Sequence, residues 1–249
     1  MKQYFFYLIL FFHISLNACI NHHNNFDTIL NYIDTDDHHP YTIVLLDIDN
    51  TIAAPAGTFV ASDQWVSHHM KIKMKEGLSA RQAWMAIKDL YVYLQHQIDL
   101  MLIEEITATI IKELQSRGII VIAITARLPE IGDRTIMQLS NIGIEFSSLW
   151  HEELLGNENL SYHYKQGIIF CDGNDKGKVF EDIVKRINKS FTKIIAVDDK
   201  ENNLKALQKV VLPSVKFIGI RYGYLDTIVS AFDHEQAELD LQKYLVTIQ

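Results

Sequence analysis

Residues 43–51 read Ile-Val-Leu-Leu-Asp-Ile-Asp-Asn-Thr, an apolar run that ends at two carboxylates. Three further runs rich in Ile and Val span 119–124, 194–197 and 215–220, and a shorter apolar run spans 142–146. Apolar runs without alternation are typical of strands buried on both faces, as in parallel sheets. The sequence therefore predicts a parallel sheet built from these segments.

Amphipathic segments separate the predicted strands. Apolar residues recur at helical spacing over 103–115, 179–187 and 204–210, which predicts a helix in each segment. Strands that alternate with helices favour a doubly wound, Rossmann-like α/β fold over residues 42–225. The chain has 249 residues, 48% of them hydrophobic, which is enough for one sizeable core.

A helical insert, about 55–101, interrupts this alternation after the first strand. Serines at 62 and 79 predict the starts of two helices, 62–75 and 79–97, with Gly77 between them. On the second helix one apolar face is expected to be core: Ala83, Trp84, Ile87, Leu90, Tyr91 and Leu94. Because α/β sheets bind ligands at the carboxyl ends of their strands, we expect the insert to form a small cap there.

Residues 1–18 carry one lysine and then an apolar run over 4–14, too short to cross a bilayer. This pattern predicts a secretory signal, with a buried N-terminal helix as the alternative. Leu-Asn-Ala-Cys at 16–19 resembles the bacterial lipobox, in which the cysteine is acylated; cleavage after Ala18 without lipid is the alternative. We therefore expect export to the periplasm, the outer membrane or the medium, with membrane contact only through a lipid on Cys19.

The two ends of the chain are expected to be helical. Residues 19–41 predict a lead-in with a helix that caps the domain, and 226–249 predict a C-terminal helical segment. That segment is expected to pack on the sheet, with contact to a partner as the alternative. Two cysteines, Cys19 and Cys171, exclude a disulfide scaffold. If Cys19 is not acylated, it could form a disulfide with Cys171 in an oxidising compartment.

The charge balance indicates one class of partner that the chain is not expected to bind. The chain has 23 Lys and Arg against 31 Asp and Glu, a net charge of −8. This argues against nucleic acid as a partner, because phosphate backbones select basic faces. The oligomeric state is not indicated by the sequence.

Some of the acidic residues follow predicted strands. Asp47 and Asp49 come directly after the first strand, and Asp198 and Asp199 after 194–197. The carboxyl ends of neighbouring parallel strands meet at one edge, so these four carboxylates are expected to converge. Without a cation they would repel one another. Hard oxygen ligands in this arrangement favour Mg²⁺.

Residues suited to an anion are expected at the same edge. Thr125 ends the 119–124 strand, and Lys176 opens the helix that precedes 194–197. A hydroxyl, a positive charge and a helix N-terminus together suit a phosphate group. Lys178 is the second choice for Lys176. Arg127 and Arg221 also follow strands at this edge, and the sequence is compatible with either a substrate contact or a structural salt bridge for each.

Four short motifs resemble those of haloacid dehalogenase-like (HAD) phosphatases. They are Leu45-Leu46-Asp47-Ile48-Asp49-Asn50-Thr51, Ile124-Thr125, Lys176, and Val197-Asp198-Asp199. The resemblance covers residues 42 to about 225. Further details resemble a smaller bacterial family of HAD-like proteins of uncertain function, often exported: Asp63-Gln64-Trp65, Thr125-Ala126-Arg127, 173–177, 198–203 and 219–222.

The resemblance implies a covalent mechanism. Asp47 would attack phosphorus and form an aspartyl-phosphate. Asp49 would protonate the leaving oxygen and then deprotonate the water that hydrolyses the intermediate. Thr125 and Lys176 would bind the phosphoryl oxygens. The implied substrate is a phosphorylated small molecule or an exposed phospho-side chain, phosphotyrosine among them.

The resemblance also implies the metal ligands. Mg²⁺ would be held by Asp47, by the backbone carbonyl of Asp49, and by Asp198, Asp199 or both, with Asp199 the closer match to the family. Thr51 follows the pattern of the phosphatase branch. Asp49 is the second aspartate of the motif, which the dehalogenase branch lacks.

Three other protein classes share some of these residues. Receiver domains use similar residues in a different order, and the glycine-rich stretch 173–179 is one residue short of a P-loop and has Val where Ser or Thr would bind Mg²⁺. Neither fits. The remaining alternative is a catalytically silent HAD-like surface or binding protein, which is disfavoured because every motif position has a competent residue.

Overall fold

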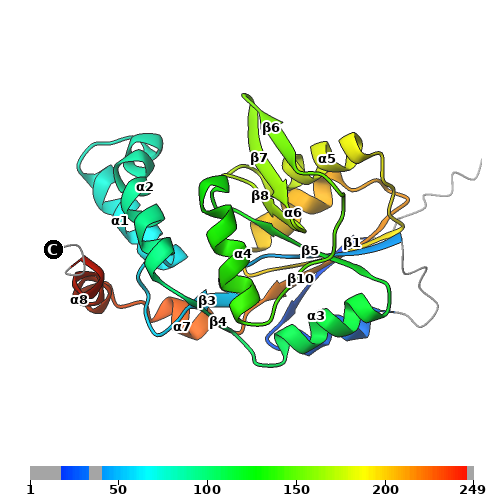
Figure 1. Ribbon diagram of the computed structural model, residues 1–249, viewed down its shortest axis with the longest axis horizontal. Coiled ribbons are helices and arrows are strands. Elements are labelled where there is room, and N and C mark those ends of the chain that lie inside the picture. The colour runs from blue at the N-terminus through cyan, green and yellow to red at the C-terminus, as the bar shows by residue number, and fades with distance from the viewer. Residues whose placement is uncertain (1–17, 34–40, 246–249) are drawn as a thin grey trace, which may run out of the picture.

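A computed structural model describes residues 18–33 and 41–245, and shows a central sheet with helices on both sides (Figure 1). The sheet has eight strands in the order β1-β10-β9-β2-β5-β8-β7-β6. Their bounds in this order are Ala18–His23, Lys216–Tyr222, Lys193–Asp198, Thr42–Leu46, Ile120–Thr125, Ile168–Phe170, Leu160–Lys165 and Leu154–Asn157. The predicted signal, residues 1–18, lies outside the described residues except for Ala18.

The six strands from β1 to β8 in this order are parallel, and the hairpin β7–β6 is antiparallel. The central strand β2 pairs with both β5 and β9, so that Leu46 lies opposite Ala123 on one side and Val197 on the other. This register brings the carboxyl ends of the three strands to one edge. The prediction of a mostly parallel α/β sheet is confirmed.

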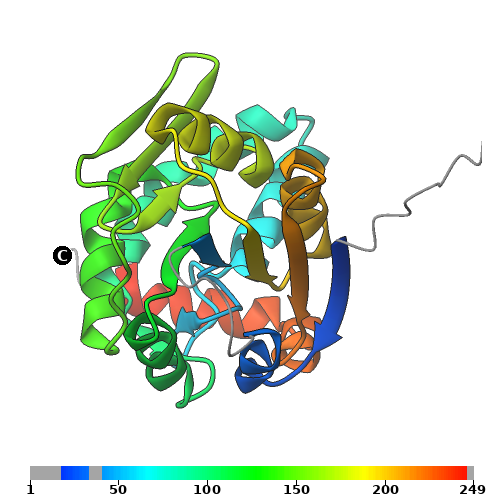
Figure 2. The ribbon, with the colours of Figure 1, turned by 90° about the vertical axis from the view of Figure 1, so that its right-hand side faces the viewer.

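Helices cover the sheet on both faces (Figure 2). The 3₁₀ helix η1 (Phe26–Tyr32), α3 (Thr107–Ser116) and α4 (Gly132–Asn141) pack on one face, and α5 (Lys176–Ile187) and α6 (Glu201–Val210) on the other. Strand β2 is buried throughout and divides its side chains between the two cores. Val44 and Leu46 join the first core, while Ile43 and Leu45 join the second.

The helical insert is closed at its base by a short antiparallel ribbon of β3 (Ala53–Pro55) and β4 (Leu100–Leu102). Between these strands lie α1 (Asp63–Lys75) and α2 (Ala80–Gln97), which project from one end of the molecule (Figure 1). Both predicted serine caps are present. The Ser62 side chain accepts from the Trp65 N–H, and Ser79 forms a capping box with Gln82.

The C-terminal segment packs on this insert. Helix α7 (Asp226–Ser230) leads to α8 (His234–Leu245), whose Ala237 and Leu241 are buried in one cluster with Trp65, Tyr91 and Leu94. The expectation that residues 226–249 pack on the sheet is therefore wrong. Since α2 presents its apolar face to α8 as well as to α1, the C-terminal helix completes a core that the insert alone would leave open.

The expected lead-in helix is present as η1, which packs on the core through Phe26 and Ile29, while residues 18–23 before it form the edge strand β1. Another expectation is wrong. Residues 142–146 form no strand. They close the end of α4, where Gly143 has a positive φ of 79° and the Ile144 N–H donates to the Leu139 carbonyl. This is a helix C-cap, whose short apolar pattern resembles a strand.

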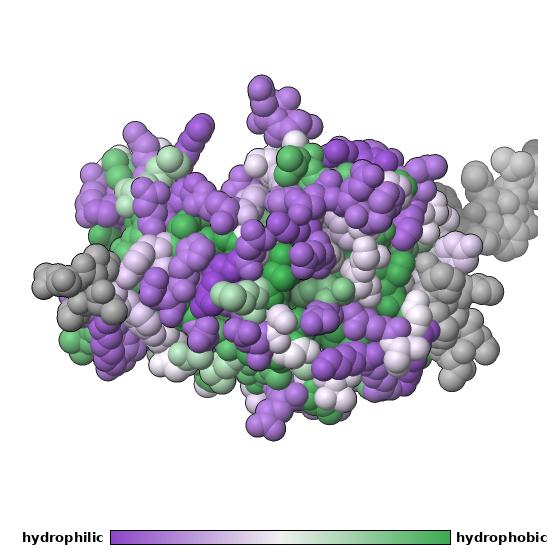
Figure 3. All heavy atoms as spheres, in the orientation of Figure 1, coloured by the Kyte–Doolittle hydropathy of each residue, from purple (hydrophilic) through white to green (hydrophobic). Residues whose placement is uncertain are grey.

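The described residues contain no disulfide between the two cysteines, since Cys19 is exposed and Cys171 is buried and both are free. Among the described helices, none is long and apolar enough to cross a membrane. Hydrophilic side chains dominate the face shown in Figure 3.

Candidate functional site

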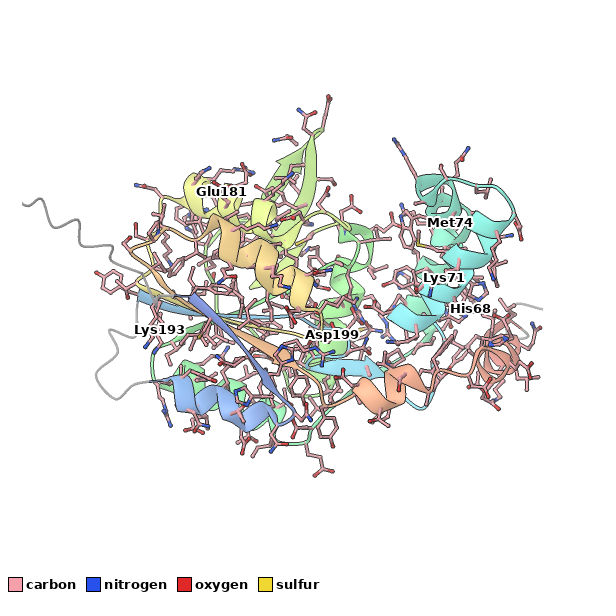
Figure 4. The ribbon with its side chains drawn as sticks, turned by 180° about the vertical axis from the view of Figure 1, so that it is seen from behind. His68, Lys71, Met74, Glu181, Lys193 and Asp199 are labelled. Carbon is pink, nitrogen blue, oxygen red and sulfur yellow. The ribbon has the colours of Figure 1, made fainter. Side chains whose placement is uncertain are left out.

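A carboxylate cluster lies at the carboxyl edge of the central strands. Asp47 follows β2, while Asp198 ends β9 and Asp199 follows it. One carboxylate oxygen from each of the three lies within 4.8 Å of the others. Figure 4 shows Asp199 at the end of the sheet that faces the insert, whereas Lys193 is at the other end. The structure thus brings these three predicted site residues together.

The turn after β2 is set by backbone geometry. Asn50 has a φ of 59°, in the left-handed region that Asn tolerates, and its N–H donates to the Ala53 carbonyl at 3.1 Å. Thr51 is fully buried, and its Oγ1 accepts from the Asp199 N–H at 3.0 Å. That hydrogen bond ties the turn carrying Asp49 to the loop carrying Asp199.

Lys176 enters the cluster from the first turn of α5, which Asp175 caps. Its Nζ lies 2.7 Å from Asp47 Oδ1 and 2.7 Å from Asp198 Oδ2, and its side chain is 3% exposed. The neighbouring Gly177 lets this turn approach α6, because a Cβ there would lie 2.2 Å from the carbonyl oxygen of Ala206. Lys178, the second choice, is exposed and lies outside the cluster.

The two adjacent aspartates have different partners. Asp198 accepts from Lys176, from the Lys200 N–H and from the Asn203 amide. Asp199, in contrast, has a buried Oδ1 without a hydrogen-bond partner. A buried acceptor without a donor is costly, so Asp199 is the aspartate of the pair with an oxygen free to bind a cation.

Burial changes the ionisation of the cluster. It raises the pKa of Asp47 well above its usual value, although Lys176 opposes the shift, and Asp198 and Asp199 add to it. Burial likewise raises the pKa of Asp199 to about 7, against the opposing charge of Lys200. In both groups the cost of burying a charge outweighs the positive charge nearby, which raises the pKa. A divalent cation would supply further positive charge.

Arg127 is paired with Asp49. Its Nε and Nη2 donate to the two oxygens of Asp49 at 2.9 and 2.8 Å, while Nη1 donates to Thr135 and Gln138. Burial alone would raise the pKa of Asp49, but the charge and hydrogen bonds of Arg127 outweigh it and lower the pKa. Arg127, one of the two arginines considered, therefore makes an internal salt bridge to Asp49.

Two further predicted residues, Thr125 and Arg221, have partners within the chain. Thr125 ends β5 and is buried, with its Oγ1 accepting from the Arg127 N–H at 3.2 Å. Arg221 pairs with Asp226.

An ion pair that the sequence analysis did not identify joins the site to the insert. Lys200, directly after the aspartate pair, forms a salt bridge to Asp63 at the start of α1. Both residues lie in stretches, 63–65 and 198–203, that resemble the same small family, but nothing in either stretch indicates that the two pair.

A cavity of about 430 Å³ opens beside Asp49, between the sheet edge and the insert. It is lined by Asp49, Asp63, Val66, Met70, Trp84, Tyr91, Ala126, Arg127, Leu128, Asp172 and Gly173. Trp84 is half-buried: it lines this cavity and also packs against the core of the insert, as the helical pattern predicts.

The fold and this edge define a mixed α/β protein with an acidic cluster under a helical insert. The chain belongs to the family described as "Protein of unknown function (DUF2608)", whose model matches residues 22–247. It is also 25% identical over 182 residues to a Chlamydia pneumoniae protein named "Putative outer membrane protein". That alignment covers 72% of this chain and 68% of the relative.

Proposed function

We propose that this protein is a Mg²⁺-dependent phosphomonoester hydrolase of the HAD type, acting through an aspartyl-phosphate on Asp47. The observation that carries the proposal is the meeting of Asp47, Asp198 and Asp199 with Lys176 at the carboxyl edge of a parallel sheet. Thr125 ends the neighbouring strand β5, on the same edge. These are the residue types that phosphoryl transfer through a carboxylate requires.

The donor set fits a hard divalent cation. Carboxylate oxygens are the ligands that Mg²⁺ prefers, and the buried Oδ1 of Asp199 has no other partner. Asp47, Asp199 and the Asp49 carbonyl would hold the ion, while Asp198 accepts hydrogen bonds from Lys176 and Asn203. The ion supplies positive charge that keeps the carboxylates ionised and offsets charge on the phosphoryl oxygens.

The side chains take separate roles. Asp47 attacks phosphorus, and Thr125 and Lys176 bind the phosphoryl oxygens on which charge develops. Asp49 moves the proton, first to the leaving oxygen and then from the attacking water. Because Arg127 donates to both Asp49 oxygens and holds the pKa of Asp49 low, it opposes the protonation that this role needs, and loosening of the pair would favour it.

That salt bridge is also the observation that favours the second candidate, a catalytically silent HAD-like surface or binding protein. If Arg127 never releases Asp49, the edge binds a cation or phosphate without turning it over. The two candidates share the metal site and differ only in proton transfer.

Hydrolysis of 4-nitrophenyl phosphate in Mg²⁺ tests the proposal. We expect turnover by the wild type, its loss in EDTA, and a loss of at least about 1,000-fold in Asp47→Asn, which removes the nucleophile. Asp89→Asn, on the exposed side of α2, is the matched control and should keep full activity. A wild type that binds Mg²⁺ but releases no phosphate from a broad set of monoesters would establish the silent alternative.

Localisation is part of the proposal. Export is supported by the signal-like residues 1–18 and by the printed name of the Chlamydia pneumoniae relative. We propose a periplasmic or outer-membrane-associated protein, held by a lipid on Cys19 or released after cleavage following Ala18. Cell fractionation and palmitate labelling of the wild type and of Cys19→Ser distinguish the two, because only an acylated Cys19 would incorporate label.

A further inference from the structure

We propose that the cavity beside Asp49 binds the uncharged aromatic ring of an aryl phosphate, so that the ring is the leaving group. This deepens the proposed function and rests on it for the hydrolytic step. The binding of an aromatic phosphate, in contrast, can be measured without turnover. The cavity's lining, its position and its charge each support this ligand class.

Aromatic and apolar side chains form much of the lining. Trp84 and Tyr91, which are seven residues or about two turns apart on α2, meet edge to face with ring centroids 5.7 Å apart and planes at 60°. Val66 and Met70 contribute from the facing helix α1. A half-buried Trp face beside Met and Val is a surface on which a flat ring gains contact area and favourable ring geometry.

The position of the cavity matches a leaving group. Asp49 and Arg127 line the same cavity as Trp84. In the proposed reaction the group that leaves departs on the side of the residue that protonates it, which is Asp49. The volume of about 430 Å³ falls within the range of small-molecule sites and is ample for one ring.

The charge of the lining disfavours a second anion. Three carboxylates line the cavity, but Asp49 is paired with Arg127 and Asp63 with Lys200, so the lining offers no unpaired cation and Asp172 adds a negative charge. A leaving group with further phosphates would therefore meet carboxylates without a free cation. A separate cavity of about 420 Å³ beside α1 is more basic, since its lining includes His68, Lys71 and the Lys200–Asp63 pair. Figure 4 shows His68 and Lys71 together on that helix.

The test compares phenyl phosphate, ethyl phosphate and a nucleoside diphosphate as substrates of the same variants. We expect Trp84→Ala to lower kcat/KM for phenyl phosphate about 10- to 100-fold, the effect of losing an aromatic contact, while ethyl phosphate changes less than about twofold. Trp84→Phe should retain most of the activity. Met85→Ala, its neighbour with 62% exposure, is the control and should change neither. Lys71→Ala tests the separate, more basic cavity beside α1.

Binding separates failure of this inference from failure of the proposed function. Calorimetry with phenylphosphonate and methylphosphonate in Mg²⁺ uses Asp47→Asn with and without Trp84→Ala, each checked for an unchanged Tm. Tighter binding of phenylphosphonate that Trp84→Ala abolishes supports the cavity even if no ester is hydrolysed. Turnover that is equal for phenyl and ethyl phosphate and insensitive to Trp84 overturns the cavity and leaves the hydrolase. Preference for the nucleotide, lost in Lys71→Ala, also overturns it.

Discussion

Replacing Arg127 with Met tests the buried pair between Arg127 and Asp49 quantitatively. The wild-type guanidinium is 1% exposed and makes four hydrogen bonds, two of them to Asp49. Met fills similar volume without charge, so Asp49 loses its counter-charge. Breaking a buried pair in this way typically costs about 3–5 kcal/mol. Because the Asp49 side chain is 16% exposed, we expect the lower end, about 3 kcal/mol.

The paired variant supplies the magnitude of the interaction. Asp49→Asn alone is expected to cost about 2–3 kcal/mol, since the guanidinium stays buried without a carboxylate. The double variant should cost clearly less than the sum of the two, leaving a coupling energy of about 2 kcal/mol. For a chain of this length, 3 kcal/mol corresponds to a fall in Tm of about 6–12 °C.

The penalty should also depend on pH. Arg127 lowers the pKa of Asp49, so in the wild type this stability is present above the ordinary aspartate pKa and lost as the pH falls. Without Arg127, burial raises the pKa of Asp49, and the carboxyl can escape its cost by protonation at low pH. The stability gap between wild type and Arg127→Met is therefore expected to narrow from pH 8 to pH 5.

Urea unfolding in EDTA, followed by circular dichroism, measures all four proteins of the cycle. Additive losses, or a gap that does not vary with pH, would refute the claim that the pair is a buried, ionised contact. Thr135→Val is the control, because it removes a hydrogen bond of Arg127 at 3.2 Å without removing charge. It should cost about 1 kcal/mol at every pH.

Three further predictions concern the metal, the insert and the thiols. Burial raises the pKa of Asp199 to about 7 from its ordinary 3.8, so its stabilising effect is full below about pH 4 and lost as the pH rises through 7. Asp199→Asn should therefore raise the metal-free Tm at pH 8 and abolish the rise in Tm that Mg²⁺ gives the wild type, in differential scanning fluorimetry. Leu241→Ala, at a buried position of α8, should cost about 2–3 kcal/mol in urea unfolding, whereas Leu239→Ala, 64% exposed, should cost less than about 0.5 kcal/mol. Burial raises the pKa of Cys171 to about 12, so Ellman's reagent should titrate Cys19 alone in the reduced native chain and Cys171 only after unfolding; rapid reaction of both would contradict the packing described.

The sequence predicts those site residues whose signal lies in the residues next to them in the chain. Asp47 adjoins the apolar run of β2, and Asp198 and Asp199 adjoin that of β9. Predicting each strand therefore also places these aspartates at its carboxyl end. Lys176 is similarly marked by its position at the start of α5. In a parallel sheet the ends of neighbouring strands converge, which is why residues far apart in the chain could be assigned to one edge.

The parts that the sequence does not predict depend on contacts between distant segments. The salt bridge between Arg127 and Asp49 joins two strand ends, and the sequence around each residue does not indicate its partner. Strand β1 is a short polar-flanked segment whose partner β10 lies near the far end of the chain. Residues 142–146 have the apolar pattern of a short strand but form a helix C-cap, because the two can share that pattern.

The edge strand β1 has a consequence for the order in which the chain can fold. Its Cys19 lies opposite Ile218, so the first described strand hydrogen-bonds to the last. A ribosome makes β1 early and β10 late, and the sheet edge therefore stays unpaired until nearly the whole chain has been synthesised. Such a long-range closure is slow, because the loop entropy is lost before the contact forms. The late pairing of β1 with β10 would suit the proposed export, because a chain has to be unfolded while it is threaded through a membrane channel.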